Sequence, residues 1–370
     1  MIQTFDIELD KKQIRISTGQ SVKGNIVYYG NDNQYPSNME SIIDGSETAT
    51  LCLATETKFT STDFTNPEIG KMSYGRNWFN RPYTLNQIKR EIAESMAKFN
   101  GAYLMVNRDL KGNVVTLNVL DFTKCRFAEF DDTMRSTGIW YGDWSKEIKG
   151  KKKGNFTKFP LYSPDYNTYK SFAEAYRTTA SIYPIFYNTS YYYPESPYES
   201  VIYDMLTEKE IQVNRFEEIT QGTPAKLVIR TDISTDEIQR QAEIEQIKQF
   251  AGSKGDRVLI ISTSFDEDGN PIDNGYALDT IQDTRDLSKF SDAEDRLEKN
   301  IRKCVQIPSI LISPNDGATI DGSAAQMEAA ITYYNDITKS KRQIISDSLT
   351  EILGFDCSMV DFGQQNKEEI

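Results

Sequence analysis

Histidine is absent from this chain of 370 residues. Its absence excludes Ser-His-Asp and Cys-His nucleophilic sites, His-ligated zinc and imidazole acid-base catalysis. The sequence also has no run of about 18 apolar residues and no basic-apolar leader in residues 1–10, so it predicts neither a membrane span nor a secretory signal. A phosphate-binding loop is missing too, because Gly70-Lys71 lacks the earlier glycine and the hydroxyl residue of that motif. Any ATP-driven step would therefore belong to a partner.

Cysteine is scarce. The four cysteines, Cys52, Cys125, Cys304 and Cys357, lie far apart and form no Cys-x-x-Cys pair. This spacing predicts buried free thiols and a protein that folds in a reducing compartment, the cytoplasm.

Acidic residues outnumber basic ones, 55 to 42, for a net charge of -13. This balance argues against ordinary nucleic-acid binding, in which lysines and arginines displace condensed counterions. It does not exclude a channel, because DNA slides past a neutral or acidic wall more easily than past a basic one. The composition, 38% hydrophobic and 26% charged, is globular, and the length allows two or three domains.

The first half of the chain predicts an α+β domain. Residues 1–24, with a strand-like stretch at 13–16, are interpreted as an arm. After the turn-rich segment 30–36, a helical pattern begins at Ser37, and an amphipathic helix is expected over 85–99, stopped by Asn100-Gly101. Two alternating runs, 102–106 and 114–120, predict an antiparallel hairpin, and 126–130 and 137–141 predict further strands.

Two unusual stretches follow. The basic segment 146–154 is interpreted as a solvated hairpin loop. Tyrosines cluster over 162–203, including Tyr191-Tyr192-Tyr193-Pro194, which suits either a contact surface between subunits or a platform for stacking bases. Because few cations lie near these tyrosines in the sequence, packing in a contact surface is favoured over base stacking.

The second half predicts a small module between two helices. A helix is expected over 198–220, then a strand at 226–230, a helix over 235–250 that Ser234 and Glu237 begin as a capping box, and strands at 257–262 and 276–281. A charged helix follows over 285–306, and Pro308 prevents its continuation.

The final helix is expected over 324–353 with Ser323 as its N-cap, a length of about 45 Å. Basic residues within 338–343 interrupt its apolar stripe. A bend or a contact between subunits is expected there.

The order of these parts resembles the portal proteins of tailed bacteriophages, over most of residues 25–355. The matching segments are Pro194-Glu-Ser-Pro-Tyr-Glu-Ser200, Phe216 to Ile229 with its Gln-Gly-Thr-Pro turn, the charged helix from Asp283 into Ile301 to Leu311, Gly30-Asn-Asp-Asn-Gln-Tyr-Pro36, and Asn100-Gly-Ala-Tyr-Leu-Met-Val106.

The resemblance implies a division of the chain. Residues 25–197 would form an α+β wing, 198–220 and 284–307 two stem helices, and 221–283 a clip inserted between them. Residues 308–323 would form a tunnel loop, 324–353 a long wing helix, and 354–370 a short tail, so that the large crown found in some portal proteins would be short or missing.

The resemblance also implies a function and its residues. A ring of about twelve copies at one capsid vertex would let DNA be packaged and ejected, in a particle assembled in the host cytoplasm. Its partners would be the terminase large subunit, head-completion or neck proteins, the major capsid protein and double-stranded DNA in transient contact, with no membrane and no cofactor. The tunnel-loop residues would be Ser313, Asn315, Asp316, Gly317, Thr319, Asp321, Gly322 and Ser323. The clip residues would be Lys226, Arg230, Glu237, Lys248, Lys254 and Arg257. The stem residues would be Glu208, Arg215, Arg285, Lys289 and Arg296.

Two alternatives stay open, namely another structural protein of a phage head or neck, and a magnesium-dependent carboxylate nuclease. Asp132 with Glu147-x-Lys149 imitates a nuclease site, but Asp10-x-Lys12 has the same local spacing, so the pattern is weak evidence. Residues 266–269 resemble a calcium loop whose glycine comes too early, and a hairpin turn is expected instead. The sequence therefore favours a non-enzymatic protein.

Overall fold

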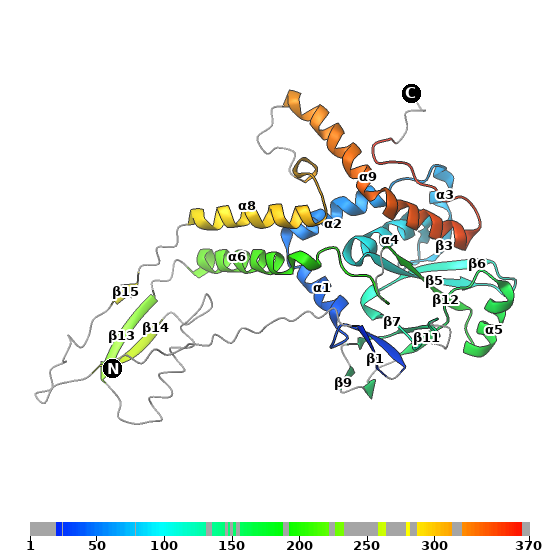
Figure 1. Cartoon of the computed structure of the whole chain (residues 1–370), viewed down its shortest axis with the longest axis horizontal. Helices are drawn as coiled ribbons and strands as arrows, with labels where there is room; N and C mark the ends of the chain where they lie inside the picture. The colour runs from blue at the N-terminus through cyan, green and yellow to red at the C-terminus, as the bar shows by residue number, and fades with distance from the viewer. Residues whose placement is uncertain are drawn as a thin grey trace, which may run out of the picture. The chain divides into compact units, whose positions relative to one another are not determined.

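The computed structural model describes residues 20–23, 25–77, 79–130, 135–144, 147–148, 151–152, 156–187, 192–221, 226–232, 258–263, 279–281, 287–312 and 320–364. The chain divides into two compact units (Figure 1). Unit 1 combines Met1–Arg15 with Thr207–Asp295, and unit 2 combines Ile16–Leu206 with Arg296–Ile370.

The centre of unit 2 is an antiparallel sheet of three strands in the order β12 (Ala180–Phe186), β5 (Gly101–Arg108) and β6 (Val114–Leu120). The β5–β6 hairpin confirms the pairing expected from the alternating runs. Strand β12 was not expected, because Pro184 lies in its middle. Proline has no N–H to give to a ladder, and β12 tolerates it as an edge strand.

Helix α4 (Leu85–Phe99) packs on β5 and confirms the expected amphipathic helix. Thr84 and Gln87 form a capping box at its start, and Asn100 ends it in the left-handed conformation, with φ at 54°. Residues three or four apart put one face of the helix into the core, where Ile88, Ile92 and Met96 are completely buried.

An aromatic cluster covers the other face of β5. Tyr103 contacts Phe122, Phe127 and Phe186, and Tyr193 stacks on Tyr29 with ring centroids 4.3 Å apart. Tyr193 and Tyr198 of the tyrosine-rich region are buried in this core. Their aromatic surface therefore stabilises their own subunit, and these two are not available to stack bases or to contact another copy.

Other elements of unit 2 lie before β5, between β6 and β12, or after β12 in the chain. The helices are α1 (Tyr35–Ile43), α2 (Glu47–Thr60), α3 (Pro67–Lys71), α5 (Tyr166–Tyr176) and the 3-10 turns η1 (Phe122–Lys124) and η3 (Glu199–Val201). The strands are β1 (Gln20–Lys23), β2 (Ile26–Tyr29), β3 (Ser73–Arg76), β4 (Pro82–Thr84), β7 (Cys125–Phe127), β8 (Ile139–Tyr141), β9 (Glu147–Ile148), β10 (Lys151–Lys152) and β11 (Thr157–Phe159).

Three expectations for this region need correction. Strand β1 pairs with β2, so the arm boundary at residue 24 falls inside a hairpin, for which Gly24-Asn25 is a turn signal. Helix α1 begins at Tyr35, before the expected Ser37, because proline is favoured in the first turn of a helix. Strands β7 and β8 are shorter than expected. The β9–β10 pair confirms a hairpin in the basic stretch, while the strand expected at 13–16 lies outside the described residues.

Unit 1 holds a sheet in the order β14 (Val258–Thr263), β13 (Lys226–Asp232) and β15 (Asp279–Ile281). Strands β13 and β14 are parallel, whereas β15 is antiparallel to β13. Each strand lies within three residues of its expected start. A parallel pair requires a long crossover connection, which the expected helix over 235–250 would supply, but that segment lies outside the described residues.

Two helices have residues in both units, α6 (Ile202–Gln221) and α8 (Leu287–Cys304), close to the bounds expected from the sequence. The 3-10 turn η4 (Ser309–Leu311) and helix α9 (Ile320–Leu353) follow in unit 2. Helix α9 has 34 residues and a length of about 50 Å.

Helix α9 begins before the expected Ser323, so Asp321, Gly322 and Ser323 belong to its first turn and not to the preceding loop. The alanine-rich sequence that follows has a high helix propensity, and it outweighs the cost of about 1 kcal/mol for one glycine.

All four cysteines are free, and Cys52, Cys125 and Cys357 are buried as expected, whereas Cys304 is only partly buried. Among the helices that the structure describes, none has the length and apolar content needed to cross a bilayer.

Candidate functional site

Polar contacts join α8 to α6 in unit 1 and to the segment just before α6 in unit 2. In unit 1 the Arg215 guanidinium lies 2.6 Å from a carboxylate oxygen of Glu294. In unit 2 the Cys304 thiol donates to the carbonyl of Pro197 at 2.8 Å and lies 3.3 Å from the Ser200 hydroxyl.

The end of α8 is fixed by backbone geometry. Gln306 adopts the left-handed conformation, with φ at 56°. Its N–H donates to the carbonyl of Lys303, and the N–H of Ile307 donates to the carbonyl of Arg302, both at 3.1 Å. This pair of bonds is the Schellman motif. The helix therefore ends just before Pro308, as expected. The left-handed residue that ends it is Gln306, and the glycine that usually marks such a position in a sequence is absent.

Helix α9 carries a buried polar cluster in its middle. Arg342 donates to the Thr338 hydroxyl at 2.7 Å, to the Asn335 carbonyl at 3.0 Å and to the Phe59 carbonyl of α2 at 3.0 Å. The same guanidinium pairs with Asp361. The basic residues of the α9 stripe were expected to mark a bend or a contact with another subunit. Arg342 instead contacts groups of its own chain, because its donors satisfy carbonyl groups that α2 and α9 leave in the core.

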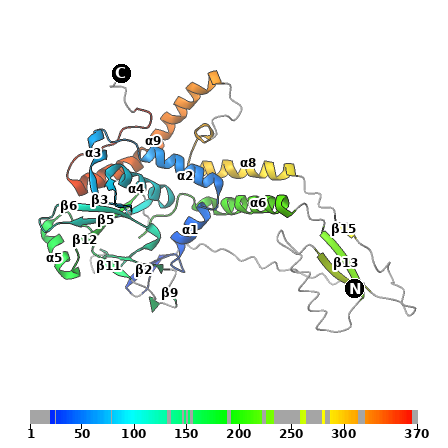
Figure 2. The same cartoon turned by 180° about the vertical axis from the view of Figure 1, so that it is seen from behind.

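Lys341, the residue before Arg342, forms an ion pair between α9 and α2. The Lys341 ammonium contacts the Glu56 carboxylate, and Glu56 is 3% exposed while Lys341 is 9% exposed. Burial, followed by the charge of Glu56, raises the pKa of the Tyr198 and Tyr334 hydroxyls well above the usual value. The two tyrosines therefore stay neutral beside a carboxylate whose countercharge is Lys341. Figures 1 and 2 show α2 beside α9.

The segment after α9 returns along its own helix. The Ser358 carbonyl accepts from Thr65 N–H at 2.9 Å, and Val360 N–H donates to the Asp63 carbonyl at 3.0 Å. Asn335 exchanges two hydrogen bonds with Phe362, at 2.9 and 3.0 Å. Residues 354–364, expected to be a simple tail, therefore fasten α9 to the loop after α2.

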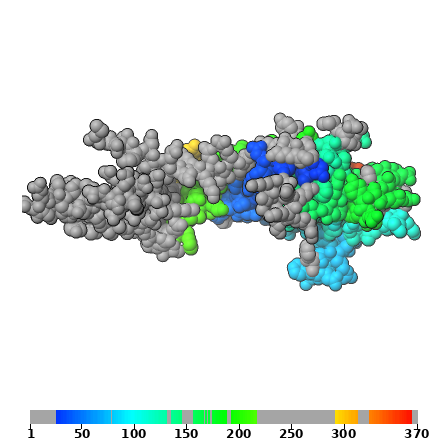
Figure 3. All heavy atoms as spheres, turned by 90° about the horizontal axis from the view of Figure 1, so that it is seen from below, coloured from blue at the N-terminus to red at the C-terminus, as the bar shows by residue number. Residues whose placement is uncertain are grey.

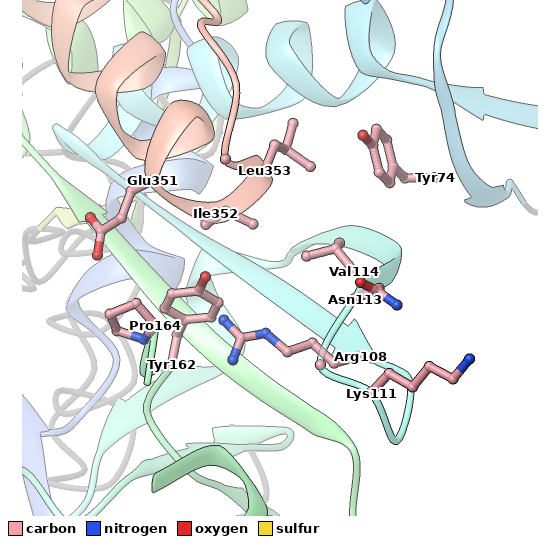
Figure 4. Close-up of a pocket in the computed structure, with 12 residues that line it drawn as sticks. Tyr74, Arg108, Lys111, Asn113, Val114, Tyr162, Pro164, Glu351, Ile352 and Leu353 are labelled. Carbon is pink, nitrogen blue, oxygen red and sulfur yellow. The ribbon is translucent and has the colours of Figure 1, made fainter. Parts of the chain in front are cut away.

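A polar cavity of about 460 Å³ lies at the last turn of α9, beside the β5–β6 turn (Figure 4). The Arg108 guanidinium lies 4.2 Å from the centre of the Tyr162 ring and donates to the Ser163 carbonyl at 2.7 Å. On the other side, Glu351 accepts a hydrogen bond from the Tyr183 hydroxyl at 2.6 Å. Both charges are engaged by the chain's own groups, which suits a structural connection between α9 and the sheet.

The fold agrees with solved structures of one particle. A chain in the virion of the native gene transfer agent (GTA) particle superposes with a TM-score of 0.56 at 13% identity, over 93% of this chain and 87% of that chain. A chain in the neck of the native GTA particle, computed with C12 symmetry, gives 0.53 at 11% identity, over 90% and 84%. The chain has the fold of a GTA neck protein.

The other comparisons give weaker matches or none. An HK97 family phage portal protein from Corynebacterium diphtheriae matches at 9% identity over 86% of this chain and 90% of that chain, with a TM-score of 0.39, and no argument rests on it. No protein-family model and no curated protein match the sequence. The mixed α+β class expected from the sequence is confirmed by the described helices and strands. Sequence identities of 13% and 11% to the GTA chains show that the folds agree and do not identify the function of this chain.

The described residues of this chain include only some of those expected to be functional. Arg215 lies between α6 and α8, Glu208 is buried on α6, and Arg296 is exposed on α8. Lys226 and Arg230 lie in β13, and Lys289 lies in α8. Asp321, Gly322 and Ser323 lie in α9. The others lie outside the described residues, namely Ser313, Asn315, Asp316, Gly317, Thr319, Glu237, Lys248, Lys254, Arg257 and Arg285.

The nuclease and calcium alternatives receive no support. Asp132, Lys149 and residues 266–269 lie outside the described residues, whereas Glu147 lies in β9. Within the described ranges, no three acidic, cysteine or histidine side chains are grouped closely enough to hold a metal ion. The Gly70-Lys71 pair lacks the earlier glycine and the hydroxyl residue of a phosphate-binding loop. The Lys71 ammonium lies 2.7 Å from a carboxylate oxygen of Glu68.

The sequence did not point to the residues that hold α9 in place. Glu56, Asn335 and Asp361 are ordinary polar residues in the sequence, and they acquire a role only when α2, α9 and the following segment meet. The available signal was the set of basic residues on an otherwise apolar helical stripe, because a buried cation needs a partner.

Proposed function

We propose that the chain is a portal protein, whose identical copies form a closed ring at one capsid vertex through which DNA is packaged and ejected. The observation that supports this most is the near complete overlap with the GTA virion chain, 93% of one and 87% of the other. Overlap over that share of both chains supports a match of the whole fold and not of one part alone. The neck with C12 symmetry supports a ring of twelve copies.

In this proposal α6 and α8 form the stem, and the region of β13, β14 and β15 is the clip that docks the terminase motor and later the neck proteins. The tunnel loop is residues 308–319, because α9 begins at Ile320. Between Pro308 and Ser323 the sequence has two aspartates and no lysine or arginine. Such a loop gives DNA phosphates no cation to hold, so contact with a passing duplex is weak and independent of sequence.

Symmetry makes the loop sensitive to added charge. In a ring of twelve, one substitution to lysine places about twelve positive charges around the axis. Each phosphate that a protein neutralises steepens the fall of log K with log salt by about 0.9. A basic ring would therefore hold DNA at low salt and release it as salt rises.

The test uses Asn315→Lys and Thr319→Lys, with Asn315→Gln and Thr319→Ser as matched controls. Ring assembly should be unchanged, while DNA packaging slows at low salt and recovers in part at higher salt. The amount of DNA packaged per particle is measured for each lysine variant and its control. Equal packaging by the lysine variants at low salt would contradict the placement of the loop.

Electron microscopy of the purified protein tests the ring itself. We expect closed rings with an axial hole wide enough for a duplex, whereas a stable monomer under all assembly conditions would refute the proposal. A ring that occupies the neck but not the capsid vertex of isolated particles would favour another neck protein. Removal of residues 226–281 should abolish motor docking, and retained docking would contradict the clip assignment.

A further inference from the structure

The β3–β4 hairpin projects from unit 2, as the light-blue segment of Figure 3 shows. Phe79, in its turn, is 83% exposed. An aromatic side chain held in water forgoes the stabilisation that its burial would give. A projecting, exposed phenylalanine is therefore a candidate contact residue.

Hydrogen bonds fix the backbone of this turn. The Asn77 side-chain oxygen accepts from the N–H groups of Phe79 and Arg81, both at 3.0 Å. Asn77 N–H donates to the Arg81 carbonyl and Asn80 N–H donates to the Asn77 carbonyl, each at 2.9 Å. Arg76 donates to the Asn80 carbonyl at 2.9 Å. Since these bonds hold the described residues of the turn, Asn77 and 79–81, Phe79 can enter a partner at a small cost in conformational entropy.

The base of the hairpin is anchored as well. Gly75 has a φ of 96°, and a Cβ there would lie 3.1 Å from the Thr116 methyl carbon of β6. Leu85 N–H donates to the Met72 carbonyl at 2.8 Å. The buried Tyr83 donates its hydroxyl hydrogen bond to Glu91. The hairpin is therefore a firm projection of unit 2.

The charges beside Phe79 indicate an acidic partner. Arg76 and Arg81 are exposed on either side of the turn. The chain has a net charge of -13, so another copy of the same chain presents mainly acidic surface. A basic projection on an acidic protein thus fits a second copy by charge complementarity.

The same unit carries a pocket of matching chemistry between α4 and β6. The cavity is about 240 Å³, smaller than the roughly 300 Å³ at which small-molecule sites begin, so it suits a single side chain. Its apolar lining consists of Phe99, Val119, Leu120 and Phe122, and its acidic lining of Glu40, Glu91, Glu94 and Asp121. The one lysine in the lining, Lys98, pairs with Glu40 at 3.3 Å and with Asp44 at 3.1 Å.

We propose that Phe79 enters the α4–β6 pocket of the adjacent copy, with Arg76 and Arg81 against the acidic rim. The proposal rests on the ring of the proposed function. Each copy would then use its hairpin on one neighbour and its pocket on the other. Contacts of this head-to-tail type generate a ring when the rotation closes.

Cross-linking tests the contact directly. Phe79→Cys and Leu120→Cys are combined in one chain, with each single variant as a control for the native cysteines. Oxidation of assembled protein should give a ladder of covalent multimers only in the double variant. Rings seen by microscopy without this ladder would overturn the contact and leave the portal proposal standing. A ladder without closed rings would support the contact and contradict the portal ring, and the absence of both would refute the two proposals together.

Substitution then tests the chemistry. Phe79→Ala should raise the protein concentration needed for half-assembly about 30-fold. Leu110→Ala, which changes another exposed apolar residue in a hairpin turn, should leave that concentration within about twofold. Arg81→Glu should weaken assembly about tenfold, and Glu94→Arg in the same chain should restore most of the loss.

Thermal melting of each variant distinguishes lost contact from lost folding. An unchanged half-assembly concentration for Phe79→Ala would overturn the proposal. So would a Phe79→Ala protein that assembles normally but loses binding to DNA or to the capsid protein, because the hairpin would then serve a different partner.

Discussion

Replacement of Lys341 by methionine should destabilise unit 2 strongly. Methionine preserves the length of the side chain but removes the charge that pairs with Glu56. Glu56 is 3% exposed, so its carboxylate cannot recover water without opening the contact between α2 and α9. The neighbouring Tyr198 and Tyr334 rings give it no countercharge.

The expected loss is about 3–5 kcal/mol, the range found when one partner of a buried ion pair is removed. A total free energy of unfolding of about 5–15 kcal/mol makes this a large fraction. The double variant Glu56→Leu with Lys341→Met removes both charges, and it should unfold within about 1 kcal/mol of the natural sequence or be more stable. The coupling between the two substitutions is therefore expected to be several kcal/mol.

Urea unfolding of all three variants measures these differences. Lys339→Met is a suitable control, because Lys339 is an exposed lysine on the same helix, and its replacement should change the free energy of unfolding by less than about 0.5 kcal/mol. The reasoning would be refuted if Lys341→Met and Lys339→Met had the same stability, or if the double variant were as unstable as Lys341→Met.

Three further predictions concern single residues. Gln306→Gly should stabilise the end of α8 by about 1 kcal/mol, because glycine adopts the left-handed conformation without strain, while Gln306→Ala should give no such gain in a melting experiment. Burial lowers the pKa of Lys89 to about 8, against 10.5 in the unfolded chain. The folded state then binds fewer protons between these values, so stability rises with pH in that window. Relative to Lys89→Met, the natural protein should gain about 2 kcal/mol between pH 7 and pH 9.5, and parallel pH curves would contradict this. Burial also raises the pKa of Cys125, and it raises that of Cys357 to about 11. Iodoacetamide at pH 8 should label Cys304, the least buried thiol, before Cys125, and mass spectrometry after a short pulse would detect the reverse order.

The sequence predicted elements whose signals are local. Helix α4 combines an apolar stripe, a capping box and Asn100, and each signal depends on residues within one turn of the helix. The β5–β6 hairpin likewise has regular alternation on both sides of a turn that contains Gly112. Such elements are specified before any tertiary contact forms.

The features that the sequence missed depend on distant residues. Strand β12 has Pro184 in its middle and forms only because β5 offers an edge. The partners of Arg342 include Phe59 of α2, which is 283 residues away in the chain, and Asp361. Helix α9 begins at Ile320 because helix propensity prevailed over the expected cap at Ser323. Many expected tunnel and clip residues lie outside the described ranges, so those assignments stay predictions.

The polar cluster of α9 has a mechanical consequence. Asn335, Thr338 and Arg342 occupy successive turns of one face, and each is bonded to another side chain, to α2 or to the returning segment 354–364. A slide of the helix by one turn would break these bonds together, so partial slippage has no stable intermediate position. A force on the first turns of α9 would thus displace the whole helix together with α2. The helix would transmit the force as a rigid body and would not stretch.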